Sequence, residues 1–214
     1  MRVPLIYQMT RYDCGPTTLV NALRFLYERE EIDPELVRAV YARTLDDCSE
    51  DGELGKLGTS HQAMRHVARY LNVYARGAAF PIATDVLDGE RAGLTAGSYA
   101  YRELESNGGA DAWRPRAAAI ARVWHGDNGH YILLTGVAHG RVLAFDPFLE
   151  DAPGTVDGVR IREVQGMPFV ANRSVDVRAF SSDVRADYAL KNARNAEPSD
   201  PEGGELILLR RTDR

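Results

Sequence analysis

Residues 8–26 read QMTRYDCGPTTLVNALRFL, a short polar lead-in, one cysteine and then the pattern of an amphipathic helix. Apolar side chains recur at positions 19, 22, 23 and 26, which is the spacing of a helix with one buried face. Asp13 stands where a helix N-cap is expected, and Pro16 is tolerated in a first turn. This stretch therefore predicts a packed helix that begins at Cys14.

The predicted position of Cys14 favours an activated thiol. The first turn of a helix carries unpaired N–H groups and the positive end of the macrodipole, which stabilise an anion such as a thiolate. Gln8 lies six positions upstream, so its amide can point to the same place as the backbone N–H of Cys14. Two such donors beside a nucleophile are what an oxyanion hole requires. Because a free cysteine is more often a small buried hydrophobe, a catalytic role also needs a partner base.

A histidine on a predicted β-hairpin can serve as that base, and an aspartate on the same hairpin can orient it. Residues 129–137, GHYILLTGV, have the composition of a strand, and residues 141–146, RVLAFD, that of its return strand. His130 lies near the start of the first strand and Asp146 at the end of the second. If they share a face, Asp146 can fix the tautomer and the orientation of the imidazole. A lone histidine on a strand is more often a satisfied core residue, but its combination with a helix-start cysteine indicates acyl-transfer chemistry.

The register of this hairpin decides whether the two side chains meet. Side chains alternate between the faces of a strand, and directly paired residues have a constant sum of residue numbers. A regular two-residue turn at 139–140 gives an odd sum, which places His130 and Asp146 on opposite faces. We therefore predict an even sum, from a three-residue turn at 138–140 or an equivalent bulge, with the two side chains within hydrogen-bonding range. His125 is the alternative base for the odd register.

The rest of the chain predicts helices first and strands later. Residues 33–34 start a second helix, and residues 58–60 open a third helix that Asn72 closes. We expect strands at residues 3–7, 73–75, 117–123 and 205–209, and a short helix at residues 98–104. This order predicts an α+β architecture.

The length of 214 residues fits a single domain, residues 1–214. Residues 77–116 have weak periodicity, so we expect an insertion or lid there. Everything from residue 149 reads as a C-terminal extension, and its polar run at 191–204 is expected to be a loop. Residues 46–58 read as an acidic, glycine-containing loop.

Composition excludes several classes of function. The net charge of −5, without a basic stripe, argues against nucleic-acid binding, and no apolar run approaches the length of a membrane span. The cysteine motif follows the first residues too closely for a signal peptide, and two cysteines make no disulfide framework. We therefore expect a cytoplasmic protein, with Cys48 incidental. His61 and His66 lie five apart instead of four, so no metal or other cofactor is predicted.

Three stretches carry a resemblance to a known family, the papain-like cysteine peptidases that process the double-glycine leaders of bacteriocins. The first is Gln8-x-x-x-x-Asp13-Cys14-Gly15 with the following helix. The second is Gly58-Thr59-Ser60 at a helix start, followed by Ala68-Arg69-Tyr70-Leu71-Asn72-Val73. The third is Gly129-His130-Tyr131, a β run, Gly136-Val137 and Asp146-Pro147. The resemblance covers residues 1–75 and 117–148, so residues 77–116 and the tail are additional to the family's pattern.

The resemblance implies a papain-like fold, with a helical N-terminal half whose nucleophile helix packs on an antiparallel β half. It implies Cys14 as nucleophile, His130 as base, Asp146 as the residue that orients the base, and Gln8 as oxyanion donor. We therefore expect a cysteine hydrolase that cleaves a peptide or amide bond of a peptide or protein substrate through a thioester. The alternatives are a non-catalytic peptide-binding module on the same fold and an acyltransferase or transglutaminase-type enzyme.

Overall fold

The computed structural model describes residues 3–108, 114–150, 154–156, 158–164, 169–192, 195 and 204–213. The helix predicted at residue 14 is present as α1 (Cys14–Tyr27), and its apolar positions 19, 22, 23 and 26 are fully buried. Asp13 occupies the N-cap position but caps no helical N–H. Its carboxylate instead accepts hydrogen bonds from the backbone N–H groups of Met9 and Thr10, at 3.2 and 2.8 Å. Asp13 therefore ties the lead-in segment to the start of the helix.

The described residues form five α-helices, one 3₁₀ helix and eight strands. The helices are α1, α2 (Pro34–Tyr41), α3 (His61–Ala78), η1 (Gly89–Ala92), α4 (Tyr99–Glu105) and α5 (Val177–Phe180). The strands are β1 (Ile82–Asp88), β2 (Ala117–His125), β3 (Asn128–Ala138), β4 (Arg141–Phe145), β5 (Thr155–Val156), β6 (Val159–Glu163), β7 (Arg173–Asp176) and β8 (Glu205–Arg211). Among them, no helix has both the length and the apolar character needed to cross a membrane.

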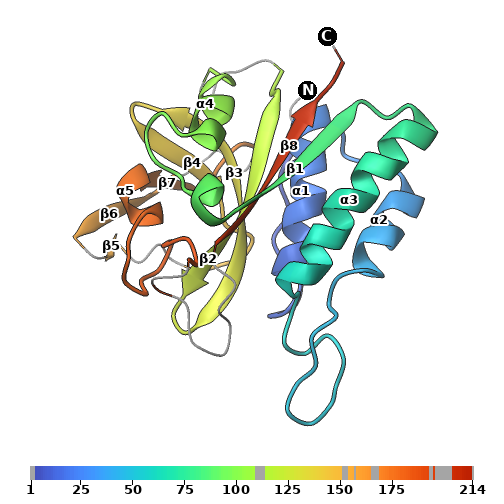
Figure 1. Ribbon diagram of the computed structural model, residues 1–214, viewed down its shortest axis with the longest axis horizontal. Coiled ribbons are helices and arrows are strands. Elements are labelled where there is room, and N and C mark those ends of the chain that lie inside the picture. The colour runs from blue at the N-terminus through green and yellow to red at the C-terminus, as the bar shows by residue number, and fades with distance from the viewer. Residues whose placement is uncertain are drawn as a thin grey trace.

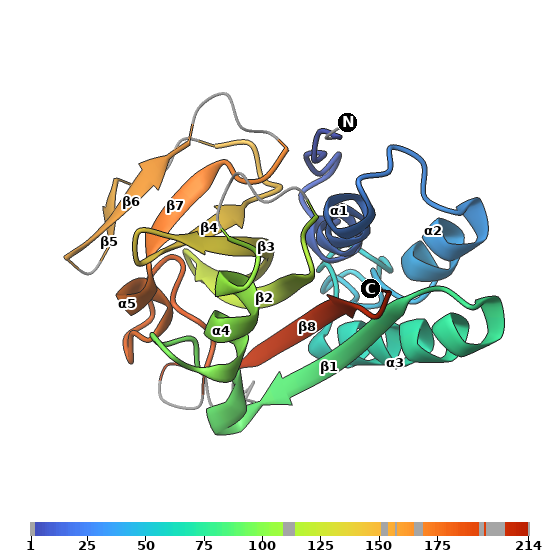
Figure 2. The same cartoon turned by 90° about the horizontal axis from the view of Figure 1, so that it is seen from above.

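The helices lie on both faces of one antiparallel sheet. Figures 1 and 2 show α1, α2 and α3 gathered on one side of the sheet, with α4 and α5 on the other. The apolar core divides in the same way, since Ala118 and Ile120 of β2 pack with the first group and Ala119 and Ala121 with the second. This division follows from the alternation of side chains along a strand. The predicted α+β fold, with a helical N-terminal half packed on an antiparallel sheet, is confirmed.

The strand order is β1-β8-β2-β3-β4-β7-β6-β5, and it includes strands from both segments that lie outside the resemblance. The segment 77–116 was expected to form an insertion or lid. It supplies β1, which pairs with β8 and buries Ile82 on one face of the sheet and Leu87 on the other, and α4, which packs on the Leu87 face. The part from residue 149 was expected to be an extension, but it supplies β8, which pairs with β1 on one side and β2 on the other. Most of the run 191–204, and residues 109–113 of the segment 77–116, lie outside the described residues.

Two predicted strands are absent, one because a helix side chain binds the backbone there and the other because a helix continues through it. Residues 3–7 form no strand, since the Asn21 amide pairs with both the N–H and the C=O of Ile6, each at 2.8 Å. The third helix, with Ser60 as its N-cap, runs through residues 73–75 to Ala78 instead of closing at Asn72. The Asn72 amide pairs with the backbone of Thr84 in β1, so this residue links a helix to the sheet.

The hairpin of β3 and β4 has the predicted even register, which a bulge produces. Its turn has two residues, His139 and Gly140, both with positive φ (51° and 72°), as a tight hairpin turn requires. The expected three-residue turn is therefore wrong. Beyond the turn the pairing shifts by one residue between Leu134 and Gly136, which leaves Thr135 as the extra residue. The sum of paired residue numbers thus changes from odd to even before the strands reach His130 and Asp146.

Asn107 supports this bulge from the end of α4. It is buried, and its Nδ2 donates to the carbonyl oxygens of Thr135 (2.8 Å) and Ala117 (2.7 Å). Its Oδ1 accepts from the backbone N–H groups of Arg116 and Ala117. A single side chain thus satisfies the bulged carbonyl and the start of β2, where no water reaches.

We predict that Asn107→Ala lowers the free energy of unfolding by about 2–4 kcal/mol, because it leaves several buried backbone groups without partners. Urea denaturation measures this change. The matched control is Glu105→Ala in the exposed last turn of α4, which should change stability by less than about 0.5 kcal/mol. Equal effects of the two substitutions would contradict the role given to Asn107.

Candidate active site

Cys14 lies where the starts of two helices meet. It is buried at the first position of α1, and the next residue, Gly15, packs against Thr59 just before α3. A Cβ atom on Gly15 would lie 2.7 Å from the hydroxyl oxygen of Thr59, so this position requires glycine. The first two stretches of the resemblance are therefore in direct contact.

The start of α1 occupies a part of the β3 edge that β4 leaves open. Pairing with β4 ends at Leu133, so the backbone of Tyr131 faces the helix instead of another strand. Its carbonyl accepts a hydrogen bond from the Thr18 hydroxyl (3.0 Å), and its N–H is directed at the sulfur of Cys14. The helix and the strand are thereby joined at the residue that follows His130.

His130 connects Cys14 to Asp146. Its Nε2 lies 2.7 Å from Oδ1 of Asp146, and its side chain also hydrogen-bonds Cys14. Both His130 and Asp146 are buried. Asp146 is fixed in turn by the N–H of Phe148, which donates to Oδ1 at 3.0 Å, and by the Asn172 amide, which pairs with the Asp146 N–H and C=O. The geometry thus brings the predicted nucleophile, base and orienting residue into one continuous network.

The charges in this network stabilise one another. Burial raises the pKa of the Cys14 thiol, but its hydrogen bond to His130, the imidazolium charge and nearby backbone N–H groups together bring it below its usual value. Burial lowers the pKa of His130, but the charge and hydrogen bond of Asp146, with the thiolate, raise it to about 10. Burial also raises the pKa of Asp146, and the imidazolium more than offsets that effect. The interactions within the network thus favour the charged forms, a thiolate and an imidazolium beside an ionised carboxylate, over the neutral groups.

Gln8 lies beside the cysteine and is held in place from two directions. Its backbone N–H donates to the carbonyl of Pro147 at 2.9 Å, which ties the lead-in to the residue after Asp146. Its side-chain Nε2 donates to the carbonyl of Thr10 at 2.8 Å. Since an amide nitrogen has two N–H groups, this bond fixes the amide and leaves a second donor.

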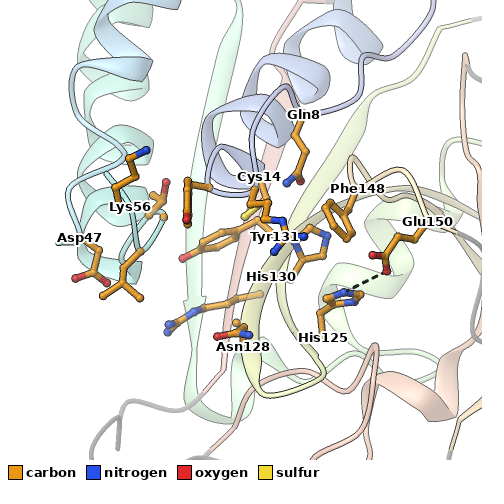
Figure 3. Close-up of a pocket in the computed structure, with 17 residues that line it drawn as sticks. Gln8, Cys14, Asp47, Lys56, His125, Asn128, His130, Tyr131, Phe148 and Glu150 are labelled. Carbon is orange, nitrogen blue, oxygen red and sulfur yellow. Dashed lines mark ion pairs between the residues drawn. The ribbon is translucent and has the colours of Figure 1, made fainter. Parts of the chain in front are cut away.

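These residues line an open pocket of about 480 Å³. Figure 3 shows the Cys14 sulfur beside the His130 ring, with the Gln8 amide above them. It also shows Asp47 and Lys56 on one side of the cysteine and His125 and Glu150 on the other. The full lining is Gln8, Arg11, Tyr12, Cys14, Asp47, Lys56, Leu57, Gly58, Thr59, Arg122, His125, Asn128, Gly129, His130, Tyr131, Phe148 and Glu150.

The alternative candidates from the sequence lie elsewhere or have other partners. His125 faces the same pocket, but it pairs with Glu150 (3.7 Å), and its ring centre is 5.5 Å from that of His130. Cys48 is exposed in the acidic loop. Within the described ranges, no group of three or more histidine, cysteine, aspartate or glutamate side chains could hold a metal ion.

Sequence reasoning missed the residues that support Asp146. Asn172 lies before β7 and Tyr188 follows α5, and both reach Asp146 across the sheet. Neither belongs to a local motif, so no signal in a single sequence indicated them.

Comparisons with known proteins give matches in structure only. Neither the models of known protein families nor the curated proteins yield a match. The chain is similar to the peptidase domain of Streptococcus ComA, a bi-functional ABC transporter of a quorum sensing pathway, at 15% identity and a TM-score of 0.39, over 68% of this chain and 79% of that one.

Two further solved structures extend over nearly the whole chain. One is a double glycine motif protease from an AMS/PCAT transporter in complex with the leader peptide, at 16% identity and a TM-score of 0.43, over 98% of this chain and 92% of that one. The other is a candidate C39-like peptidase from Bacillus anthracis, at 13% identity and a TM-score of 0.43, over 99% and 96%. All three are peptidases or proteases by description. Their low identities and TM-scores leave the chemistry of the site to its own geometry.

We predict that His130→Ala raises the pH at which Cys14 becomes reactive, because the substitution removes the imidazolium while burial still raises the thiol pKa. The rate of Cys14 alkylation by iodoacetamide, followed against pH by mass spectrometry, gives the midpoint of this titration.

The matched control for this prediction is His125→Ala, which removes the other histidine of the pocket and should leave the midpoint unchanged. A midpoint that moves with His125→Ala and stays constant with His130→Ala would reverse the assignment of the two histidines.

Proposed function

We propose that this protein is a cysteine peptidase-like hydrolase that cleaves a peptide or amide bond. One observation carries the proposal: in an open pocket, the Cys14 thiol at the start of α1 hydrogen-bonds His130, whose Nε2 lies 2.7 Å from Asp146. A nucleophile, a base in contact with it and a carboxylate that orients the base are the parts of an acyl-transfer site.

In the proposed reaction, the thiolate of Cys14 attacks the carbonyl carbon of the scissile bond. The negative charge that develops on the carbonyl oxygen is stabilised by the backbone N–H of Cys14 and the free amide donor of Gln8. As the tetrahedral intermediate collapses, the His130 imidazolium gives its proton to the leaving amine, and a thioester remains. The neutral imidazole then takes a proton from a water molecule, which attacks the thioester. Release of the carboxylic acid returns the protonated imidazole and the thiolate.

The pocket favours an extended chain as substrate. It is open to the surface, and Cys14 lies between Asp47 and Lys56 on one side and Phe148 and Glu150 on the other. A peptide or protein segment can lie along this groove with one bond at the sulfur. The mechanism needs a reduced thiol and no cofactor, so we place the protein in a reducing compartment such as the cytoplasm.

We predict that iodoacetamide at pH 7 modifies Cys14 faster than Cys48, although Cys14 is 8% exposed and Cys48 is open to solvent. Accessibility alone predicts the reverse order, so only a thiolate activated by its surroundings gives this result. Peptide mapping by mass spectrometry measures both rates in the same sample. Faster modification of Cys48 would favour a non-catalytic binding module.

We predict that the unmodified protein cleaves members of a peptide library and that Cys14→Ala abolishes this cleavage while the protein remains folded. Mass spectrometry identifies the products, and circular dichroism checks the fold. New amide bonds in place of hydrolysis products would indicate an acyltransferase, and equal cleavage by the Cys14→Ala protein would contradict the proposed nucleophile.

We predict that Gln8→Ala lowers kcat on a cleaved peptide by on the order of 100-fold, as removal of an oxyanion donor does, with little loss of stability. Gln62→Ala on the exposed side of α3 is the matched control and should leave kcat unchanged. A normal turnover number in Gln8→Ala would exclude Gln8 from the oxyanion site.

A further inference from the structure

The oxygen of Asp146 that does not face His130 has its own partner. While Oδ1 of Asp146 lies against the imidazole, the phenolic hydroxyl of Tyr188 donates a hydrogen bond to Oδ2 at 2.9 Å. The two oxygens of the carboxylate are thus bound on different sides, by His130 and Tyr188. Because a carboxylate with both oxygens held cannot rotate freely, Tyr188 fixes the direction in which Asp146 presents its charge.

The backbone around Tyr188 is held by β2. The N–H of Tyr188 donates to the carbonyl of Trp124 (3.0 Å), and the N–H of Trp124 donates to the carbonyl of Ala189 (2.9 Å). Leu190 forms a bridge with Val123, so the segment continues along the part of β2 that β8 does not reach. Tyr188 itself has a positive φ of 65°, which is unfavourable for an aromatic residue. The surrounding contacts thus hold a strained residue in the position from which its side chain reaches Asp146.

The guanidinium of buried Arg173 lies next to the Tyr188 hydroxyl. The Nε of Arg173 in β7 donates to the hydroxyl oxygen of Tyr188 at 3.2 Å, and the other guanidinium nitrogens donate to the carbonyls of Asn172 and Glu150. Among the described residues, no carboxylate lies within 4.0 Å of this guanidinium. Its charge therefore acts on the Tyr188 hydroxyl and polarises it toward Asp146.

We propose that Tyr188, polarised by Arg173, is a positioning residue of the active site and holds Asp146 in the orientation that stabilises the His130 imidazolium. This inference rests on the proposed function and extends it to a part of the chain beyond the resemblance. The order of groups is Arg173, Tyr188, Asp146, His130 and Cys14, so the neutral tyrosine lies between the guanidinium and the carboxylate in the buried network. The segment that carries Tyr188 is thus part of the site.

The proposed role has a measurable consequence at the sulfur. If Tyr188 is replaced by phenylalanine, the carboxylate loses a donor on Oδ2 and its fixed orientation, so the imidazolium is less stabilised and the thiolate forms at higher pH. Cys14, Asp146 and the neighbouring His125 are the ionisable groups that face His130, and all remain in this variant.

The experiment compares the pH dependence of Cys14 alkylation by iodoacetamide in the Cys48→Ser background, with and without Tyr188→Phe. We expect the midpoint to move to higher pH by about half a unit or more, which lowers the rate on the acid side about threefold. Tyr27→Phe is the matched control, since it also removes a tyrosine hydrogen bond, to Pro81 (2.8 Å), and should leave the midpoint in place. Asp146→Asn removes the carboxylate itself, so it should give the largest shift of the alkylation midpoint.

The outcomes separate this inference from the proposed function. An unchanged midpoint in Tyr188→Phe, with an activated Cys14 in the background protein, would overturn the positioning role alone. A midpoint that moves to lower pH would also overturn it, because the hydroxyl would then only weaken the charge of Asp146. If Cys14 titrates like an ordinary thiol in the background protein itself, the proposed function and this inference both fail. Thermal unfolding of each variant checks that it is folded under the conditions of the alkylation assay.

Discussion

One extra residue in β3 sets the geometry of the whole site. The tight turn at His139 and Gly140 would place His130 and Asp146 on opposite faces of the hairpin if pairing continued regularly. The bulge at Thr135 shifts the pairing by one residue, and the two side chains then meet at 2.7 Å. Because a bulge leaves backbone groups without ladder partners, it persists only where another group satisfies them, and Asn107 does so here. The segment expected to be a lid thus supports the position of His130 from the opposite face of the sheet.

The proposed nucleophile, Cys14, is tied to this hairpin through backbone contacts that require no particular side chain on β3. Tyr131 offers its N–H and C=O to α1 because β4 has already ended, and the lead-in is joined to the hairpin through the bond from Gln8 to Pro147. These contacts hold two elements more than a hundred residues apart in sequence. They explain how the Cys14 thiol, the His130 ring and the Gln8 amide come to the same pocket.

The first helices and the even register of the hairpin could be predicted from the sequence. Features that depend on tertiary contacts could not. The apolar stripe of α1 and the N-terminal cap of α3 are local signals, so α1 and the start of α3 were predicted correctly. The strand expected at residues 3–7 is absent because Asn21, on a helix, takes its hydrogen bonds. The four site residues could be proposed from motif and spacing, since Cys14, His130 and Asp146 lie at or near the ends of predicted elements and Gln8 lies six positions before Cys14. Asn172 and Tyr188 could not, because their roles depend on strand order, which a single sequence does not reveal.

The position of β8 makes the sheet beside the cysteine depend on a strand from late in the chain. Residues 205–211 fill the place between β1 and β2, so β1 is separated from the rest of the sheet until they have been synthesised. Long-range pairing of this kind forms slowly and exposes unpaired strand edges meanwhile. Because β2 supports both β3 and the segment that carries Tyr188, a nascent chain with Cys14 already synthesised still lacks the assembled pocket. The pocket around Cys14 therefore forms only after residues far along the chain have joined the sheet.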